Sequence, residues 1–151
     1  MQKIIVSDTS CLILLQKIGR LSLLKQLFGK VKITSVVAKE FGAELPDFIE
    51  IENPENTRYQ NILESFLDSG ESSAIALAIE KQDVLLIIDE NKARQKAKQL
   101  KLKYTGTIGI LIVAKQKNYI NSITEIIQQI LQTDFRISKA LIEEARRRCN
   151  E

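Results

Sequence analysis

The chain contains no histidine among its 151 residues. This absence excludes Ser-His-Asp and Cys-His mechanisms, a histidine general base and histidine metal ligands. The two cysteines, Cys11 and Cys149, are far apart in the sequence, so we expect no zinc site, which would need about four ligands. We interpret Cys11 as a small buried residue. Any catalytic chemistry must therefore rest on carboxylates, hydroxyls, lysine or a hard metal ion.

The chain also lacks long apolar runs. No run approaches the roughly 18 to 20 residues of a membrane helix, and the apolar stretch in residues 1–8 is shorter than the about 7 to 15 residues of a secretory signal. We therefore expect a cytoplasmic protein without a membrane partner. With 44% hydrophobic and 27% charged residues the composition is typical of a globular chain, and the length predicts one domain over residues 1–151.

Basic residues are clustered, although the net charge of +3 is too small to indicate a nucleic-acid partner. The segment 91–103 is rich in lysine and arginine and has no acid, and residues 146–148 are three arginines. Such clusters suit a phosphate backbone, but solvated helix faces explain them equally well. For residues 146–148 we favour a solvated helix end, where cations are stabilised by the helix dipole. An aromatic content of 5% indicates no base-stacking platform.

Short apolar segments alternate with amphipathic ones along the chain. Apolar runs rich in isoleucine and valine predict buried strands at residues 3–7, 31–33, 48–51 and 84–88. Helical patterns between these runs predict an α/β fold. We expect a three-layer α/β/α sandwich with a central, mostly parallel sheet of about four or five strands.

Local signals predict where several elements begin and end. Thr9 or Ser10 is expected to cap the helix after the first strand, and Thr34 or Ser35 the helix after the second. Residues 69–70 are expected to end a helix that contains residues 62–67. Residues 104–109 are expected to form a loop that leads into a helix over 110–117.

Two of the apolar strands end in an aspartate, at Asp8 and Asp89. Ligands of open α/β sheets bind outside the carboxyl ends of the strands, although either acid could instead begin a loop or cap a helix. Glu71 stands in the first turn of an apolar helix, where the helix dipole favours it, and should lie near the core. Glu40 stands at the end of an apolar helix, where the dipole opposes it, and a bound cation would offset this cost.

Four carboxylates at semi-buried positions repel one another in a low-dielectric site. Mg²⁺ or Mn²⁺ relieves this repulsion and prefers oxygen ligands. A metal held in this way lowers the pKa of bound water and stabilises charge on a phosphoryl group. This chemistry needs no histidine, in agreement with the composition.

The acidic residues occur within segments of a recognisable order, at residues 6–10, 36–40, 70–78 and 86–89, followed by residues 105–111. This order resembles the PIN domain, specifically the small single-domain prokaryotic proteins similar to VapC toxins. The resemblance extends from Lys3 to about Ile130. It implies a metal-dependent ribonuclease that cleaves an RNA phosphodiester with water and leaves a 5′-phosphate and a 3′-hydroxyl.

The resemblance also implies roles for particular residues. The catalytic acids would be Asp8, Glu40, Glu71 and Asp89. Asp8 and Asp89 would be the principal ligands of Mg²⁺ or Mn²⁺, Glu71 would bind the metal directly or through water, and Glu40 would position water or hold a second ion. The hydroxyl of Thr9 or Ser10 would brace Asp8, and Thr107 would hydrogen-bond near the pocket.

The chain departs from the family pattern after Asp89. Many PIN domains carry a further aspartate two to four residues later, where this chain has only Glu90 and Asn91 as substitutes. Lys92 and Arg94 lie beside the expected pocket, where they would engage RNA phosphates. The resemblance further implies a homodimer and, for toxins, a small antitoxin protein whose C-terminal segment covers the acidic pocket.

Two other functions compete with the nuclease. A PIN fold retained for binding would hold RNA or a partner protein without cleaving, and the missing further aspartate favours it. A receiver-like phosphotransfer domain would need paired acids after its first strand, whereas this chain has Asp8 alone between Ser7 and Thr9. We therefore favour the ribonuclease.

Overall fold

The computed structural model describes residues 3–151. Its five strands form one sheet in the order β3-β2-β1-β4-β5, and every neighbouring pair is parallel. The strands are β1 (Ile4–Ser7), β2 (Val31–Ile33), β3 (Ile49–Ile51), β4 (Val84–Ile87) and β5 (Lys103–Thr105). The predicted α/β architecture is confirmed, and the sheet of the described residues is wholly parallel.

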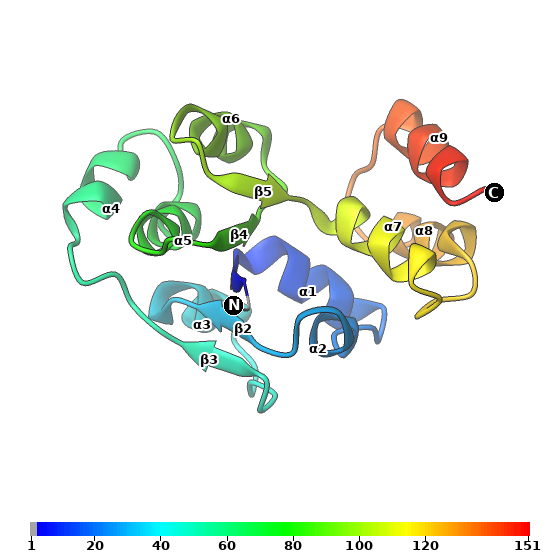
Figure 1. Cartoon of the computed structure of the whole chain (residues 1–151), viewed down its shortest axis with the longest axis horizontal. Helices are drawn as coiled ribbons and strands as arrows, with labels where there is room; N and C mark the ends of the chain where they lie inside the picture. The colour runs from blue at the N-terminus through cyan, green and yellow to red at the C-terminus, as the bar shows by residue number, and fades with distance from the viewer. Residues whose placement is uncertain (1–2) are drawn as a thin grey trace.

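Helices cover both faces of the sheet (Figure 1). The helices of residues 3–151 are α1 (Thr9–Lys17), α2 (Leu23–Phe28), α3 (Ser35–Phe41), α4 (Arg58–Leu63), α5 (Ser69–Ile79), α6 (Asn91–Gln99), α7 (Thr107–Gln116), α8 (Ile123–Leu131) and α9 (Lys139–Arg148). Residues from α4, α5 and α6 pack on one face of the sheet, whereas α1, α2, α7 and α8 pack on the other. The three-layer prediction is confirmed.

Successive side chains of the two central strands, β1 and β4, point alternately into the two layers of the core. Ile5 and Ile87 belong to the cluster under α1 and α7, while Val6 and Leu86 belong to the cluster under α5. Successive side chains of a strand point to opposite faces, so strands buried on both sides read as continuous apolar runs. This explains why the sequence shows no polar alternation in β1 and β4.

The order of strands in the sheet reverses between β1 and β4, which are neighbours in the sheet although two other strands separate them in the sequence. The chain leaves β1 toward β2 and β3 and then crosses back to β4 on the other side of β1. Ligands of open α/β sheets bind at such a reversal, outside the carboxyl ends of the strands. Because Ser7 pairs in register with Ile87, the residues that follow β1 and β4 emerge next to each other at this edge.

Three local predictions were wrong. Asp8, and neither Thr9 nor Ser10, occupies the N-cap position of α1, and its side chain makes no capping hydrogen bond. Residues 69–70 begin α5 and do not end the preceding helix, because Asp68 caps the new helix. Residues 103–105 form edge strand β5, and α7 begins directly after Gly106. Strand β5 is too short and too polar to show a buried-strand pattern, so only its pairing with β4 reveals it.

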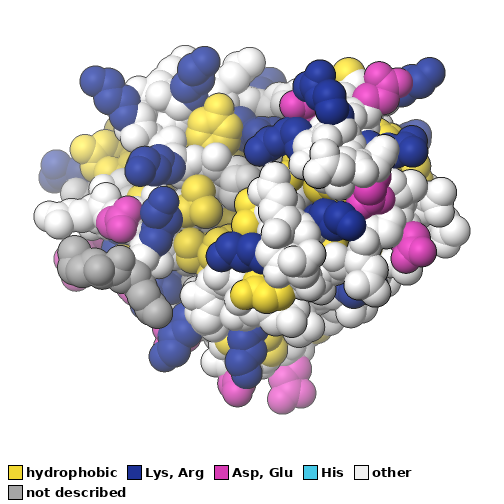
Figure 2. Space-filling view, turned by 45° about the vertical axis from the view of Figure 1, so that its right-hand side comes forward, with side chains coloured by type: hydrophobic (Ala, Val, Ile, Leu, Met, Phe, Trp, Pro, Cys, Tyr) yellow, Lys and Arg dark blue, Asp and Glu magenta, His cyan; other side chains and the backbone are white. Residues whose placement is uncertain are grey.

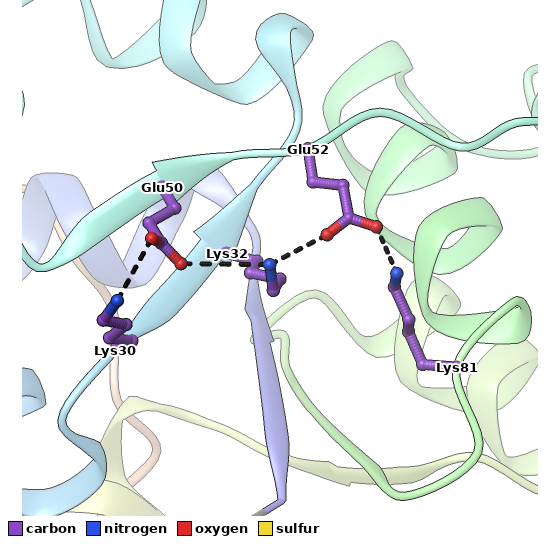
Figure 3. A network of polar contacts seen from close by, with 5 residues as sticks. All are labelled: Lys30, Lys32, Glu50, Glu52 and Lys81. Carbon is purple, nitrogen blue, oxygen red and sulfur yellow. Dashed lines mark hydrogen bonds and ion pairs between the residues drawn. The ribbon is translucent and has the colours of Figure 1, made fainter.

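A chain of ion pairs joins the edge strand β3 to β2 and to the end of α5 (Figure 3). Glu50 Oε2 lies 3.4 Å from Lys30 Nζ, and Lys32 Nζ lies 2.8 Å from Glu52 Oε1. Glu52 also pairs with Lys81. Such partly exposed pairs contribute little to stability, about 0 to 1 kcal/mol each, but charges on an edge strand oppose pairing with another chain.

Both cysteines are buried and unpaired, as expected for Cys11. Within residues 3–151, no helix combines the length and the apolar character that crossing a membrane requires.

Candidate active site

Asp8 and Asp89 stand at the carboxyl edge of the two central strands. The N–H of Asp8 donates to the carbonyl of Ile87 at 3.0 Å, which links the end of β1 to β4. Asp8 is only 4% exposed, whereas Asp89 is half-buried. The two acids therefore emerge from the sheet together but in different surroundings.

The carboxyl group of Asp8 is buried without full hydrogen bonding. Among the described residues its Oδ1 atom has no hydrogen-bond partner. Burial, together with the negative charges of Glu71, Asp68 and Glu40, raises the pKa of Asp8 to about 7. A buried acceptor without a donor is costly, and a cation would remove this cost.

Glu40, at the end of α3, shares a small space with Asp8 and Gly70. A Cβ atom on Gly70 would overlap Glu40 Oε1 and would lie 3.3 Å from Asp8 Oδ1. Glycine at this position therefore leaves room for two carboxylates. The hydroxyl of Thr9 donates to Glu40 Oε1 at 2.6 Å. Of the two hydroxyls expected to brace Asp8, those of Thr9 and Ser10, that of Thr9 instead reaches Glu40, because α1 directs it to the end of α3, where it offsets the unfavourable helix dipole.

Glu71 lies in the first turn of α5 and takes part in a reciprocal cap. Its N–H donates to Asp68 Oδ1 at 2.8 Å, and the N–H of Asp68 donates to Glu71 Oε1 at 3.4 Å. Glu71 is 7% exposed, and burial together with the charges of Asp68, Glu90 and Glu40 raises its pKa to about 7. Asp68 was not among the residues predicted for the site, although an acid three residues before Glu71 and just ahead of an apolar run is the signature of a capping box.

Asp89 is held by the N-terminus of α7. Thr107 donates its N–H to Asp89 Oδ1 at 2.8 Å and its hydroxyl to Oδ2 at 2.6 Å. A Cβ on Gly106 would lie 2.7 Å from Asp89 Oδ1, so the absence of a side chain there permits this approach. Thr107, which is fully buried, thus fixes the orientation of the Asp89 carboxylate.

Replacing Thr107 by valine is expected to lower the free energy of unfolding by about 1 to 3 kcal/mol, since the half-buried Asp89 carboxylate loses the hydroxyl donor of a fully buried side chain. Urea unfolding followed by circular dichroism measures this change. Thr105→Val is the matched control, because the Thr105 hydroxyl makes only a 3.4 Å contact with the carbonyl of Gly106. Equal destabilisation of the two variants would show that the Asp89 bond contributes nothing specific.

A cavity of about 680 Å³ opens beside these residues. Its acidic wall contains Asp68, Glu71, Asp89 and Glu90, and Asp8 and Glu40 do not line it. Of the other residues expected at the site, some line this cavity and some do not. Ser10, Asn91 and Arg94 line the cavity, whereas Lys92 lines a separate groove beside Phe66 and Lys96.

The predicted acids are thus brought together in part. Asp8, Glu40 and Glu71 repel one another, while Asp89 is bonded to Thr107. Within residues 3–151, no three carboxylate or thiol groups converge into a ready-made metal site. The unpartnered oxygen of Asp8 and the purely oxygen donor set nevertheless fit a hard divalent cation.

Fold and side chains together define an α/β protein with acidic residues at the carboxyl edge of a parallel sheet, the edge where such folds bind ligands. A family model described as PIN domain matches residues 4–151. The chain therefore belongs to the PIN domain family, whose fold is of the nuclease type. Searches found no match among curated proteins and none among solved structures.

Proposed function

We propose that this protein is a metal-dependent endoribonuclease that hydrolyses phosphodiester bonds of RNA. The observation that carries the proposal is the buried, unpartnered Oδ1 of Asp8, which faces the same space as Glu40. Membership of the PIN domain family supports the same reading. An acid this costly to bury is expected where a cation compensates it.

Asp8, Glu71 and Asp89 are the residues we assign to holding Mg²⁺ or Mn²⁺, because carboxylate oxygens are the ligands these ions prefer. A bound ion of this kind supplies an activated water and stabilises negative charge on the phosphoryl group. Thr107 keeps the Asp89 carboxylate oriented through its two hydrogen bonds. Thr9 does the same for Glu40, which we assign to positioning the attacking water or a second ion.

Three further residues that line the cavity are also assigned roles. Glu90 and Asn91, which line it, are the substitutes for the further aspartate of other PIN domains. Arg94 lines the same cavity and engages the RNA backbone in this proposal. The products are a 5′-phosphate and a 3′-hydroxyl. A toxin role, an antitoxin that covers the acidic pocket and a homodimer remain part of the proposal.

Metal-dependent cleavage tests the nuclease assignment. The purified protein is incubated with single-stranded RNA in EDTA and then with Mg²⁺ or Mn²⁺ in excess. We expect cleavage only with the divalent ion, and product ends that a phosphatase and a ligase can identify. Cleavage in EDTA, or none with either ion, would contradict the proposal.

A binding module is the second candidate, and the absence of a ready-made carboxylate cluster within residues 3–151 favours it. Such a protein would hold RNA or a partner protein without cleaving. Titration calorimetry with Mn²⁺ separates the two functions. Binding at millimolar concentration is expected for the nuclease, and its absence would favour the binding module.

A further inference from the structure

Besides its acids, which include Glu144 on α9, the cavity is lined by three arginines. Arg94 lies on α6, Arg136 lies between α8 and α9, and Arg148 ends α9, yet all three line the same cavity. The segments come from distant parts of the chain, and α6 and α9 stand on either side of the stretch from β5 to α7 (Figure 1). The cavity therefore combines an acidic wall with three guanidinium groups.

The three arginines of the cavity are not neutralised by ion pairs within the described part of the chain. Within residues 3–151, none of the three takes part in an ion pair. Arg147, on the same helix, pairs with Glu144. Lys and Arg side chains are spread over the face shown in Figure 2. Guanidinium groups without carboxylate partners that line a cavity are suited to an anionic ligand that can accept two parallel hydrogen bonds.

The end of α9 is anchored, which fixes the backbone position of Arg148. The carboxylate of Glu151 accepts from the N–H of Ile123 and from the hydroxyl of Ser122, each at 2.8 Å. Cys149, directly after Arg148, is buried. A binding group on a rigid element needs less ordering when the ligand arrives.

Aromatic rings accompany the arginines in the cavity. The guanidinium of Arg94 lies 5.3 Å from the centre of the Tyr104 ring, and both Tyr104 and Phe135 line the cavity. Guanidinium groups together with aromatic faces are the combination that binds single-stranded nucleic acid, through phosphates and base stacking. An acidic peptide would pair with the guanidinium groups but has no bases to stack on the rings. The low aromatic content predicted no base-stacking platform, whereas two of the few rings line the same cavity.

We propose that Arg136 and Arg148 act with Arg94 as the phosphate-binding wall of the substrate cavity, for the phosphates that flank the scissile bond of single-stranded RNA. Tyr104 and Phe135 provide the surface for an adjacent base. This inference rests on the proposed ribonuclease function and assigns its substrate site. It replaces the interpretation of Arg148 as part of a merely solvated helix end.

Binding of a labelled single-stranded RNA of about 10 nucleotides, measured by fluorescence anisotropy in EDTA, tests the inference. Arg136→Gln and Arg148→Gln should each weaken binding about tenfold and reduce the slope of log K against log salt by about 0.7. Arg146→Gln is the matched control, since Arg146 lies on the same helix, carries the same charge and does not line the cavity. It should change neither quantity.

The possible results distinguish a failure of the arginine site from a failure of the proposed ribonuclease function. If Arg136→Gln and Arg148→Gln bind RNA with the same affinity and salt dependence as Arg146→Gln while the wild type cleaves RNA, the phosphate-binding role of the arginines is contradicted and the nuclease function is supported. If Arg136→Gln and Arg148→Gln lose RNA binding but the wild type does not cleave RNA with Mn²⁺, the phosphate-binding role of the arginines is supported and the nuclease function is contradicted. Tighter binding of a poly-glutamate peptide than of RNA, lost in the same variants, would overturn the RNA assignment in favour of a protein partner.

Discussion

Replacing Asp8 by asparagine is expected to lower Mn²⁺-stimulated RNA cleavage about 100-fold or more, while raising the free energy of unfolding at pH 8 by about 2 kcal/mol. The two effects share one cause. The carboxylate that we assign to the metal is buried with an unpartnered oxygen beside Glu40, Asp68 and Glu71. Asparagine keeps the shape, removes the charge and brings an amide that donates to the neighbouring carboxylates.

The stabilising effect of Asp8→Asn should depend on pH in a defined direction. Burial raises the pKa of Asp8 from 3.8 to about 7, so between these values the folded protein holds a proton that the unfolded chain has released. Wild-type stability should therefore fall as the pH rises through this window, and the full penalty is present above about pH 7. Glu71, whose pKa burial also raises to about 7, acts in the same direction.

Urea unfolding in EDTA at pH 5 and pH 8 measures this dependence. The advantage of Asp8→Asn over the wild type should be larger at pH 8 than at pH 5. Asp47→Asn, in the exposed loop before β3, is the control and should change neither stability nor cleavage. A variant less stable than the wild type at pH 8 would show that the Asp8 charge is compensated within the protein. Undiminished cleavage would remove Asp8 from the catalytic site.

Replacing Gly70 by alanine is expected to reduce cleavage about 100-fold while changing the free energy of unfolding by less than about 1 kcal/mol. The new methyl group would overlap Glu40 Oε1, which ends a flexible and exposed side chain. Glu40 should therefore swing outward and lose its bond to Thr9. The better helix propensity of alanine offsets part of the cost in α5.

A double-mutant cycle with Glu40→Ala isolates this mechanism. Once the Glu40 side chain is absent, Gly70→Ala should cause little further loss of cleavage, because both changes remove the same carboxylate from the site. Ser69→Ala, one residue earlier on the exposed side of α5, serves as the control. Fully additive losses would mean that Gly70 acts through the backbone of α5 and not through Glu40.

Signals that depend on neighbouring residues could be read from the sequence. Apolar runs at β1 and β4 predicted the buried central strands, and the acid after each run predicted a site at the carboxyl edge. Glu71 was expected near the core in the first helical turn, where it lies. These features follow from side-chain periodicity, capping and helix dipoles, which act over a few residues.

Partners that come from distant segments appeared only once the chain was folded. The hydroxyl of Thr9 meets Glu40 and not the adjacent Asp8, and Thr107 holds Asp89 from the start of α7. Arg136 and Arg148 join Arg94 around one cavity although they lie far along the chain. No local pattern encodes such meetings, because they are set by which helices pack on which face of the sheet and by the register of β1 against β4.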